Sequence, residues 1–157
     1  MYKKIVVPLD GSKLAECALS YGEKLAKGCD TDEVVLISVT ESIHGYRAFE
    51  DASEPMGHRL VPEAFGKKEK QAQRYLGRMA KLMEAKGIKV STEVLIGDPA
   101  EEIAFYAKHP GCDIIVLSSH GRSGSSRWAH GSVADKVLRS SCVPVMMIRA
   151  PGCVAGI

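Results

Sequence analysis

The residues best suited to chemistry lie in one segment rich in glycine, serine and arginine, which spans residues 118–132. Gly121 and Gly124 allow backbone amides to approach a ligand without an intervening side chain. Arg122 and Arg127 add positive charge within the same segment. Because converging amides and cationic side chains bind anions, the segment favours a phosphate-binding loop.

The end of this segment has the pattern of a helix start. Gly131 is followed by Ser132 and Val133, and the first amides of a helix have no partner within it. Those amides and the helix dipole favour an anion, which the Ser132 hydroxyl can also bond. The run from Ser132 to Asp135 equally fits a capping box, with Asp in place of Glu or Gln. The residues alone leave both interpretations open: an anion site, or a turn followed by a cap.

Other polar residues near the ends of predicted strands have more than one interpretation. Asp10 can accept hydrogen bonds from a sugar or a base, lie near a phosphate-bound magnesium ion, or cap a helix that begins at about Ser12. His120 and His130, taken alone, fit structural or solvent-facing positions better than a catalytic role. Asp98 stands before a proline and is interpreted as a helix-start residue without ligand chemistry.

Several common nucleotide-binding and catalytic motifs are absent from the sequence. It contains no P-loop, no G-x-G-x-x-G after the first strand, no nucleophile elbow and no H-E-x-x-H. Without a base and a nucleophile in a recognisable arrangement, a fast enzyme is not supported. The net charge of +2 is nearly balanced, which argues against non-specific nucleic-acid binding.

The five cysteines are widely spread and form neither a C-x-x-C pair nor a Cys/His pattern. They support no zinc site and no disulfide framework. Cys17 and Cys142 stand among apolar residues and are expected to pack as small hydrophobic side chains. The apolar runs are far shorter than the roughly 20 residues of a membrane-spanning helix, and the first residues do not resemble a signal peptide. We therefore expect a cytoplasmic protein.

The pattern of the chain alternates strands and helices. Strongly apolar runs of four to eight residues predict strands, and apolar positions at helical spacing predict helices. The predicted strands are 4–9, 34–40, 89–95, 113–119 and 143–149, and the predicted helices are 12–28, 64–86, 100–108 and 132–139. A long connection, 41–61, separates the second strand from the second helix. Such alternation predicts one open, doubly wound α/β sheet with helices on both faces, with a single domain at 1–150 and a tail at 151–157.

Three finer expectations follow from the same patterns. The first helix should bury Leu14, Cys17, Ala18, Tyr21 and Leu25, and the many lysines and arginines of the second helix should form a solvated face. The strand 89–95 alternates polar and apolar residues, which predicts a position near a sheet edge. Pro144 cannot donate to a ladder, which predicts an edge position for the apolar strand 143–149. A second copy of the chain would cover that strand, so we expect a homodimer through residues 143–149.

The combined motifs resemble those of the universal stress protein family over nearly the whole chain. The likeness rests on residues 4–12, on 97–103, on 113–116 and on a phosphate loop of the form G-x2-G-x9-G-[ST]. Gly121, nine further residues and Gly131-Ser132 reproduce the second half of that loop, and Ser118 stands where its first glycine is expected. The resemblance implies a five-stranded parallel α/β fold of order 3-2-1-4-5 and a dimer through the last strand.

The resemblance also implies that the chain binds ATP. Asp10 and the backbone of Pro8 and Leu9 would contact the adenosine, and the backbone of Val39 would contact the adenine. The serine at position 118 would lie near the ribose. The remaining implied contacts, mainly to the phosphates, come from His120, Gly121, Arg122, Gly124, Gly131, Ser132 and Val133. Asp10 is the candidate ligand of a Mg²⁺ ion bound with ATP.

Three functions remain to be distinguished. Members of this kind act as stress-response regulators with slow or absent hydrolysis, so an ATP-binding regulatory homodimer is the first hypothesis. The second is a scaffold or chaperone-like dimer without a nucleotide. The third is an ATP-hydrolysing enzyme that uses Asp10 for metal and His120 or Arg127 near the γ-phosphate. AMP and cyclic AMP remain alternatives to ATP, because their adenosine contacts would be similar.

Overall fold

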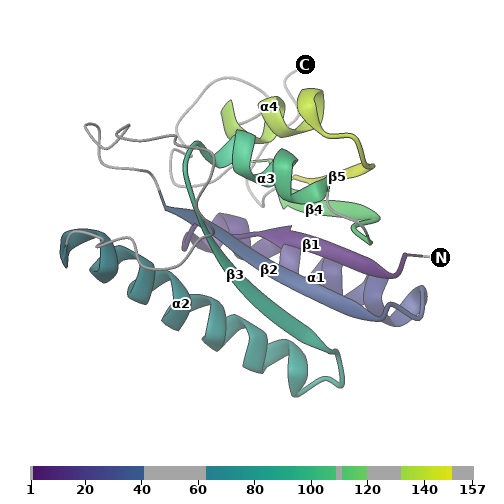
Figure 1. Ribbon diagram of the computed structural model, residues 1–157. Coiled ribbons are helices and arrows are strands. Elements are labelled where there is room, and N and C mark those ends of the chain that lie inside the picture. Colours follow the sequence, from purple (N-terminus) through teal and green to yellow (C-terminus); the bar gives the residue numbers. More distant parts are fainter. Residues whose placement is uncertain (1, 41–62, 109–110, 120–131, 150–157) are drawn as a thin grey trace.

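A computed structural model describes residues 2–40, 63–108, 111–119 and 132–149. Strands and helices alternate along the described chain, as the sequence predicts (Figure 1). In chain order the elements are β1 (Lys4–Pro8), α1 (Lys13–Gly28), β2 (Glu33–Thr40), α2 (Glu63–Glu84), β3 (Val90–Ile96), α3 (Pro99–Ala107), β4 (Ile114–Ser118), α4 (Ser132–Ser140) and β5 (Val145–Ile148). The connection 41–61 and the tail 151–157 lie outside the described residues.

The five strands form one parallel sheet in the order β3-β2-β1-β4-β5. This order confirms the doubly wound sheet and places β3 and β5 at its two edges. The first strand, β1, lies in the middle of the sheet and pairs with β2 on one side and with β4 on the other. The direction of winding therefore reverses between β1 and β4, which is where ligands bind in folds of this kind.

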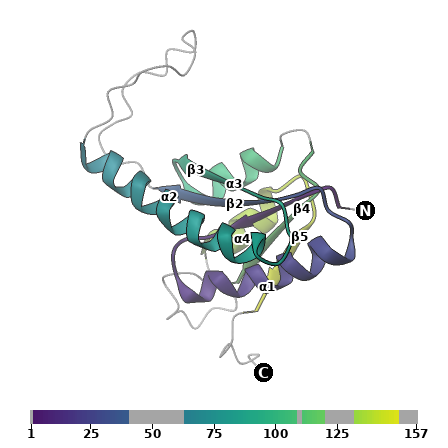
Figure 2. The same cartoon turned by 90° about the horizontal axis from the view of Figure 1, so that it is seen from below.

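Two helices cover each face of the sheet. Helices α1 and α2 pack on one face and lie across it in Figure 2, and α3 and α4 cover the other face (Figure 1). The central strands are buried on both faces, which explains their continuous apolar sequences. None of the helices in the described ranges is long and apolar enough to cross a membrane.

Helix α1 packs on the sheet through small residues, which corrects the expected face. Its buried residues are Ala15, Ala18, Gly22 and Ala26, whereas Tyr21 is 41% exposed. A Cβ added at Gly22 would lie 3.2 Å from Cγ2 of Val7 in β1. The helix axis thus approaches the sheet too closely for large side chains. Of the predicted residues, Ala18 is fully buried and Leu25 packs against the core at its margin, whereas Tyr21 lies outside.

The amino-terminal end of β1 is held by the carboxylate of Asp113, which directly precedes β4. Oδ2 of Asp113 accepts hydrogen bonds from the backbone N–H groups of Lys3 at 2.7 Å and Lys4 at 2.9 Å. The backbone N–H of Asp113 donates in turn to the Lys4 carbonyl at 3.0 Å. These three bonds extend the β1–β4 pairing beyond the last ladder residues.

The edge strand β5 is shorter than predicted and begins after Pro144. A turn precedes it, in which the Ser141 hydroxyl accepts from the Val143 N–H at 3.2 Å and donates to the Val143 carbonyl at 2.9 Å. Cys142 lies in this turn and is exposed, so its predicted packing as a small hydrophobic side chain is wrong. Met146 is 36% exposed in the strand itself.

Candidate functional site

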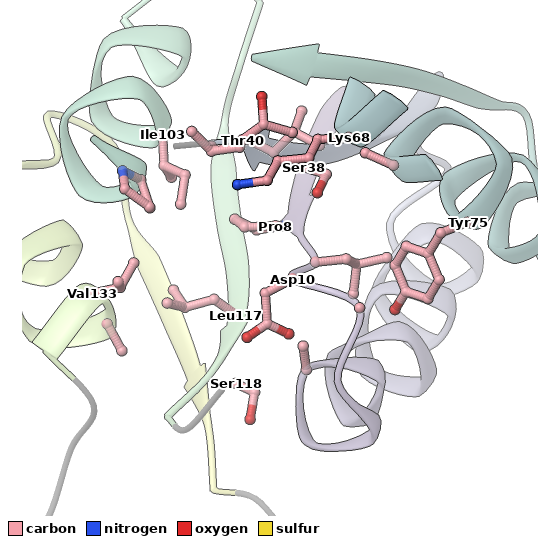
Figure 3. A pocket seen from close by; sticks show the side chains of 18 of the residues that line it. Pro8, Asp10, Ser38, Thr40, Lys68, Tyr75, Ile103, Leu117, Ser118 and Val133 are labelled. Carbon is pink, nitrogen blue, oxygen red and sulfur yellow. The ribbon is translucent and has the colours of Figure 1, made fainter. Parts of the chain in front are cut away.

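A pocket of about 720 Å³ opens at the carboxyl ends of β1, β2 and β4. Its volume is within the range of roughly 300–1,000 Å³ of small-molecule sites. Side chains from the strands and from α2, α3 and α4 surround it in Figure 3. The lining residues are Pro8, Leu9, Asp10, Gly11, Ala15, Ile37, Ser38, Val39, Thr40, Lys68, Gln71, Ala72, Tyr75, Arg78, Pro99, Ile103, Leu117, Ser118, Ser119, Ser132, Val133 and Ala134.

One wall of the pocket is the tight turn between β1 and α1. Oδ1 of Asp10 accepts from the backbone N–H of Ser12 at 2.9 Å and from its hydroxyl at 2.6 Å. The Ser12 hydroxyl oxygen accepts from the Ala15 N–H at 3.1 Å and so caps α1. Gly11 has φ +86°, which non-glycine residues rarely adopt. The turn thereby fixes the Asp10 carboxylate at the pocket, while the cap is supplied by Ser12.

The end of β2 presents backbone polar groups to the pocket. The Ile37 carbonyl accepts from the Leu9 N–H at 2.8 Å, so the backbone of Ile37 faces β1. Successive residues of a strand between two parallel neighbours face alternate sides, so Val39 faces the same side as Ile37. Strand β1 ends at Pro8, and within the described residues no hydrogen bond to the Val39 backbone is found on that side. One donor and one acceptor therefore point into the pocket side by side.

The opposite end of the pocket combines the end of β4 with the start of α4. Ser118 and Ser119 are buried, with 8% and 3% of their surface exposed. Helix α4 begins at Ser132, and both Ser132 and Val133 line the pocket with exposed side chains. The amides of this first turn lack partners within the helix, and the dipole gives that end a partial positive charge.

Helix α2 supplies a wall that the sequence did not indicate. Lys68, Gln71, Tyr75 and Arg78 recur at helical spacing and all line the pocket. The Lys68 amine extends over the ends of β1 and β2 in Figure 3. Lys68 and Arg78 are exposed, as the predicted solvated face requires, and both also line the pocket. Tyr75 is the one residue whose position in the sequence could have indicated this wall, because it stands next to the apolar stripe of α2.

Tyr75 also joins α2 to α1 beside the pocket. Its hydroxyl donates to Oε1 of Glu16 at 3.3 Å. Burial raises the pKa of Tyr75 well above the usual range, and the Glu16 carboxylate raises it further. The phenol therefore stays protonated at every physiological pH and holds α2 against the α1 start.

The charges of the pocket favour an anionic ligand. Its described lining contains two cations, Lys68 and Arg78, and one carboxylate, Asp10. The start of α4 adds partial positive charge. Within the described ranges, no group of three or more His, Cys, Asp or Glu side chains could hold a metal ion. A Mg²⁺ ion here would need oxygen ligands from phosphates besides Asp10.

The structure gathers seven of the predicted site residues around this pocket: Pro8, Leu9, Asp10, Val39, Ser118, Ser132 and Val133. The other five, His120, Gly121, Arg122, Gly124 and Gly131, lie outside the described residues. Asp98 caps α3 by accepting from Ala100 and Glu101 N–H, which confirms its interpretation as a helix-start residue.

Comparisons with known proteins agree with this architecture. The model of the universal stress protein family matches residues 1–149. The universal stress protein MJ0531 of Methanocaldococcus jannaschii is 32% identical over 151 residues, covering 96% of this chain and 84% of the relative. The solved structure of MJ0577, from the same organism, superposes with a TM-score of 0.80 at 31% identity, covering 97% of this chain and 99% of that one.

Two more distant neighbours of the same fold were solved with nucleotides. A universal stress protein in complex with cAMP has a TM-score of 0.68 at 17% identity, covering 94% of this chain and 97% of that one. The universal stress protein from Archaeoglobus fulgidus in complex with dAMP has a TM-score of 0.62 at 21% identity, covering 94% of this chain and 98% of that one.

Proposed function

The chain belongs to the universal stress protein family, and we propose that it is a cytoplasmic stress-response regulator that binds ATP in the pocket at the carboxyl ends of β1, β2 and β4. One observation carries the proposal: the same pocket has the backbone N–H and carbonyl of Val39 at one end and the start of α4 at the other. Adenine needs a neighbouring donor and acceptor, and phosphates need unpaired amides.

The adenosine lies at the β1–β2 end of the pocket in this proposal. The Val39 N–H donates to a ring nitrogen of adenine, and the Val39 carbonyl accepts from its amino group. Pro8 and Leu9 supply the adjoining backbone, and the carboxylate of Asp10 accepts from a ribose hydroxyl. Ser118 stands at the β4 side of the ribose. Relatives bound to dAMP and cAMP support an adenine nucleotide as the ligand class.

The phosphates extend toward α4, where Ser132 and Val133 offer the amides of the first turn. The predicted loop residues His120, Gly121, Arg122, Gly124 and Gly131 complete the phosphate site in the proposal. Asp10 is the one described carboxylate of the pocket and would share a Mg²⁺ ion with the phosphates. Its Oδ1 already holds Ser12, which suits ligand binding better than proton transfer. We therefore propose slow hydrolysis or none.

Nucleotide binding is tested by calorimetric titration of the purified full chain with ATP, AMP, cyclic AMP and adenosine, with and without Mg²⁺. A tryptophan at position 71 fills the pocket, because Gln71 lines it, whereas Gln73 lies on the same helix and does not. We expect Gln71→Trp to weaken ATP and adenosine binding at least about tenfold, which corresponds to about 1.4 kcal/mol. Gln73→Trp should bind like the parent chain.

Two results would overturn the proposal. If the chain stays empty at millimolar ATP, a scaffold or chaperone-like dimer becomes the better function. If Gln71→Trp and Gln73→Trp bind equally well, the nucleotide occupies another part of the molecule.

We also propose a homodimer through the edge strand, residues 143–149. Strand β5 has a neighbour on one side only, and Met146 is 36% exposed on it. A second β5 would satisfy the open edge and cover this side chain. Light scattering should give a dimer at micromolar concentration, and Met146→Lys should shift it to monomer. Leu82→Lys, at a 58% exposed position on α2, should leave it unchanged; a monomeric parent chain would remove the idea.

A further inference from the structure

Two cysteines precede the neighbouring strands β4 and β5, at the end of the sheet opposite the pocket. Strands β4 and β5 pair with Ile115 opposite Val145, and the Ile115 N–H donates to the Pro144 carbonyl at 3.0 Å. Cys112 stands three positions before Ile115, and Cys142 stands three positions before Val145. The pairing of the two strands therefore brings both cysteines to the same end of the same strand pair.

The two thiols have different surroundings. Cys112 packs against the core under α3 and α4, and burial raises its pKa to about 11. The Ile114 N–H lowers this pKa and the Asp113 carboxylate raises it, with smaller effects from Lys4 and Cys142. Cys142, in contrast, is exposed in the turn before β5.

The register of β4 and β5, continued three positions back from Ile115 and Val145, sets Cys112 opposite Cys142. Neighbouring strands lie about 4.7–4.9 Å apart, and the Cα atoms of a disulfide lie about 4.4–6.8 Å apart. Cys142 is exposed in a turn and Cys112 is partly covered. Cys142 can therefore meet a reagent from solvent, whereas Cys112 is largely shielded from it.

We propose that Cys112 and Cys142 are a redox-active pair that hydrogen peroxide converts to a reversible disulfide. The Cys142 thiolate attacks one peroxide oxygen, the O–O bond breaks, and water leaves after protonation, so that Cys142 becomes a sulfenic acid. The sulfur of Cys112 then attacks that of Cys142. The S–S bond forms, the S–O bond breaks, and hydroxide leaves with the Cys112 proton as water. Two thiols and one peroxide give one disulfide and two waters, and a dithiol reverses the reaction.

The disulfide would fasten the edge strand β5 to β4. It closes the chain from residue 112 to residue 142, which contains β4, α4 and the predicted phosphate loop. A loop of this length restricts the unfolded chain, so we expect oxidation to raise the melting temperature by roughly 5–10 °C.

Peptide mapping can identify the bond directly, because trypsin places each cysteine in a different peptide. Cys112 falls in 109–122 and Cys142 in 140–149, while 14–24, 28–47 and 150–157 hold the other three. The full chain is treated with hydrogen peroxide, alkylated and digested without reductant. We expect 109–122 linked to 140–149, and the link should disappear with dithiothreitol.

Single variants distinguish the thiol that reacts with peroxide, Cys142, from the thiol that then forms the disulfide, Cys112. Cys112→Ser should leave Cys142 as a sulfenic acid that a dimedone reagent traps, and Cys142→Ser should leave Cys112 reduced. Because Cys142 is exposed, its variant tests the pair even if Cys112→Ser fails to fold. Cys17→Ser is the matched control and should form the same disulfide as the parent chain.

Three outcomes would overturn the proposal. One is a link between 140–149 and 150–157, another is a disulfide between two chains on a non-reducing gel, and the third is over-oxidation of Cys142 without any link.

Discussion

A negative charge at the start of α4 should have opposite effects on nucleotide binding and on stability. Ser132 is the first residue of α4 and is exposed at the rim of the pocket. In Ser132→Asp, the new carboxylate lies next to the amides that we assign to the phosphates of ATP. It also interacts favourably with the helix dipole, since acidic residues in the first turn stabilise a helix.

The sizes of both effects can be worked out from this placement. Two charges about 5 Å apart repel by about 1–2 kcal/mol at an effective dielectric constant of about 40–80, which suits an exposed site. ATP binding should therefore weaken roughly five- to thirtyfold, and adenosine binding should not change. The dipole contributes about 0.3–1 kcal/mol of stability, so the melting temperature should rise by about 1–4 °C.

The matched control lies at the other end of the same helix. Ser140 is the last residue of α4 and is also exposed, about 12 Å farther along the axis at 1.5 Å per residue. That separation exceeds the Debye length of about 8 Å at physiological salt, so Ser140→Asp should bind ATP like the parent chain. Calorimetry with ATP and adenosine and thermal melts of both variants provide the test. Equal ATP affinity of the two variants would refute the placement of the phosphates at α4.

Three other predictions concern stability and reactivity. Ser12→Ala removes the cap of α1 and should lower the free energy of unfolding by about 1 kcal/mol in urea denaturation; Ser12→Thr, which keeps the hydroxyl that caps the helix and donates to Asp10, should restore most of the loss. Leu76→Ala empties a fully buried position on α2 and should destabilise the chain by about 2–5 kcal/mol, and a loss below 1 kcal/mol would contradict the packing. Because the pKa of Cys112 is about 11, its alkylation in the folded chain should quicken about tenfold for each pH unit between 8 and 10, which mass spectrometry of the 109–122 peptide measures.

The sheet could be predicted from the sequence because each central strand is covered on both faces. Ile5, Val6 and Val7 are all fully buried, so a continuous apolar run has one simple interpretation. The buried face of α1 could not be predicted in the same way. Its contact depends on how closely the helix approaches β1, and Gly22 carries no apolar side chain to reveal that approach.

The site likewise contains residues whose positions follow from the local sequence and residues whose positions depend on tertiary packing. Asp10 and Ser132 stand next to strand and helix ends, so their places at the pocket follow from the chain order. Lys68 and Arg78 belong to a helix whose cations resemble any solvated surface. Only the packing of α2 on the sheet turns these two side chains toward the pocket, and no local pattern records that orientation.

The position of β1 in the middle of the sheet has a consequence for synthesis of the protein. Its second neighbour, β4, is held to it through Asp113, which is 110 positions from Lys3 in the sequence. At about 5–20 residues per second, a ribosome needs roughly 5–20 s to make the intervening chain. During that time the apolar edge of β1 has no partner, and an unpaired edge is a template for association with other chains. The nascent protein must pass through this interval before its central strand is enclosed.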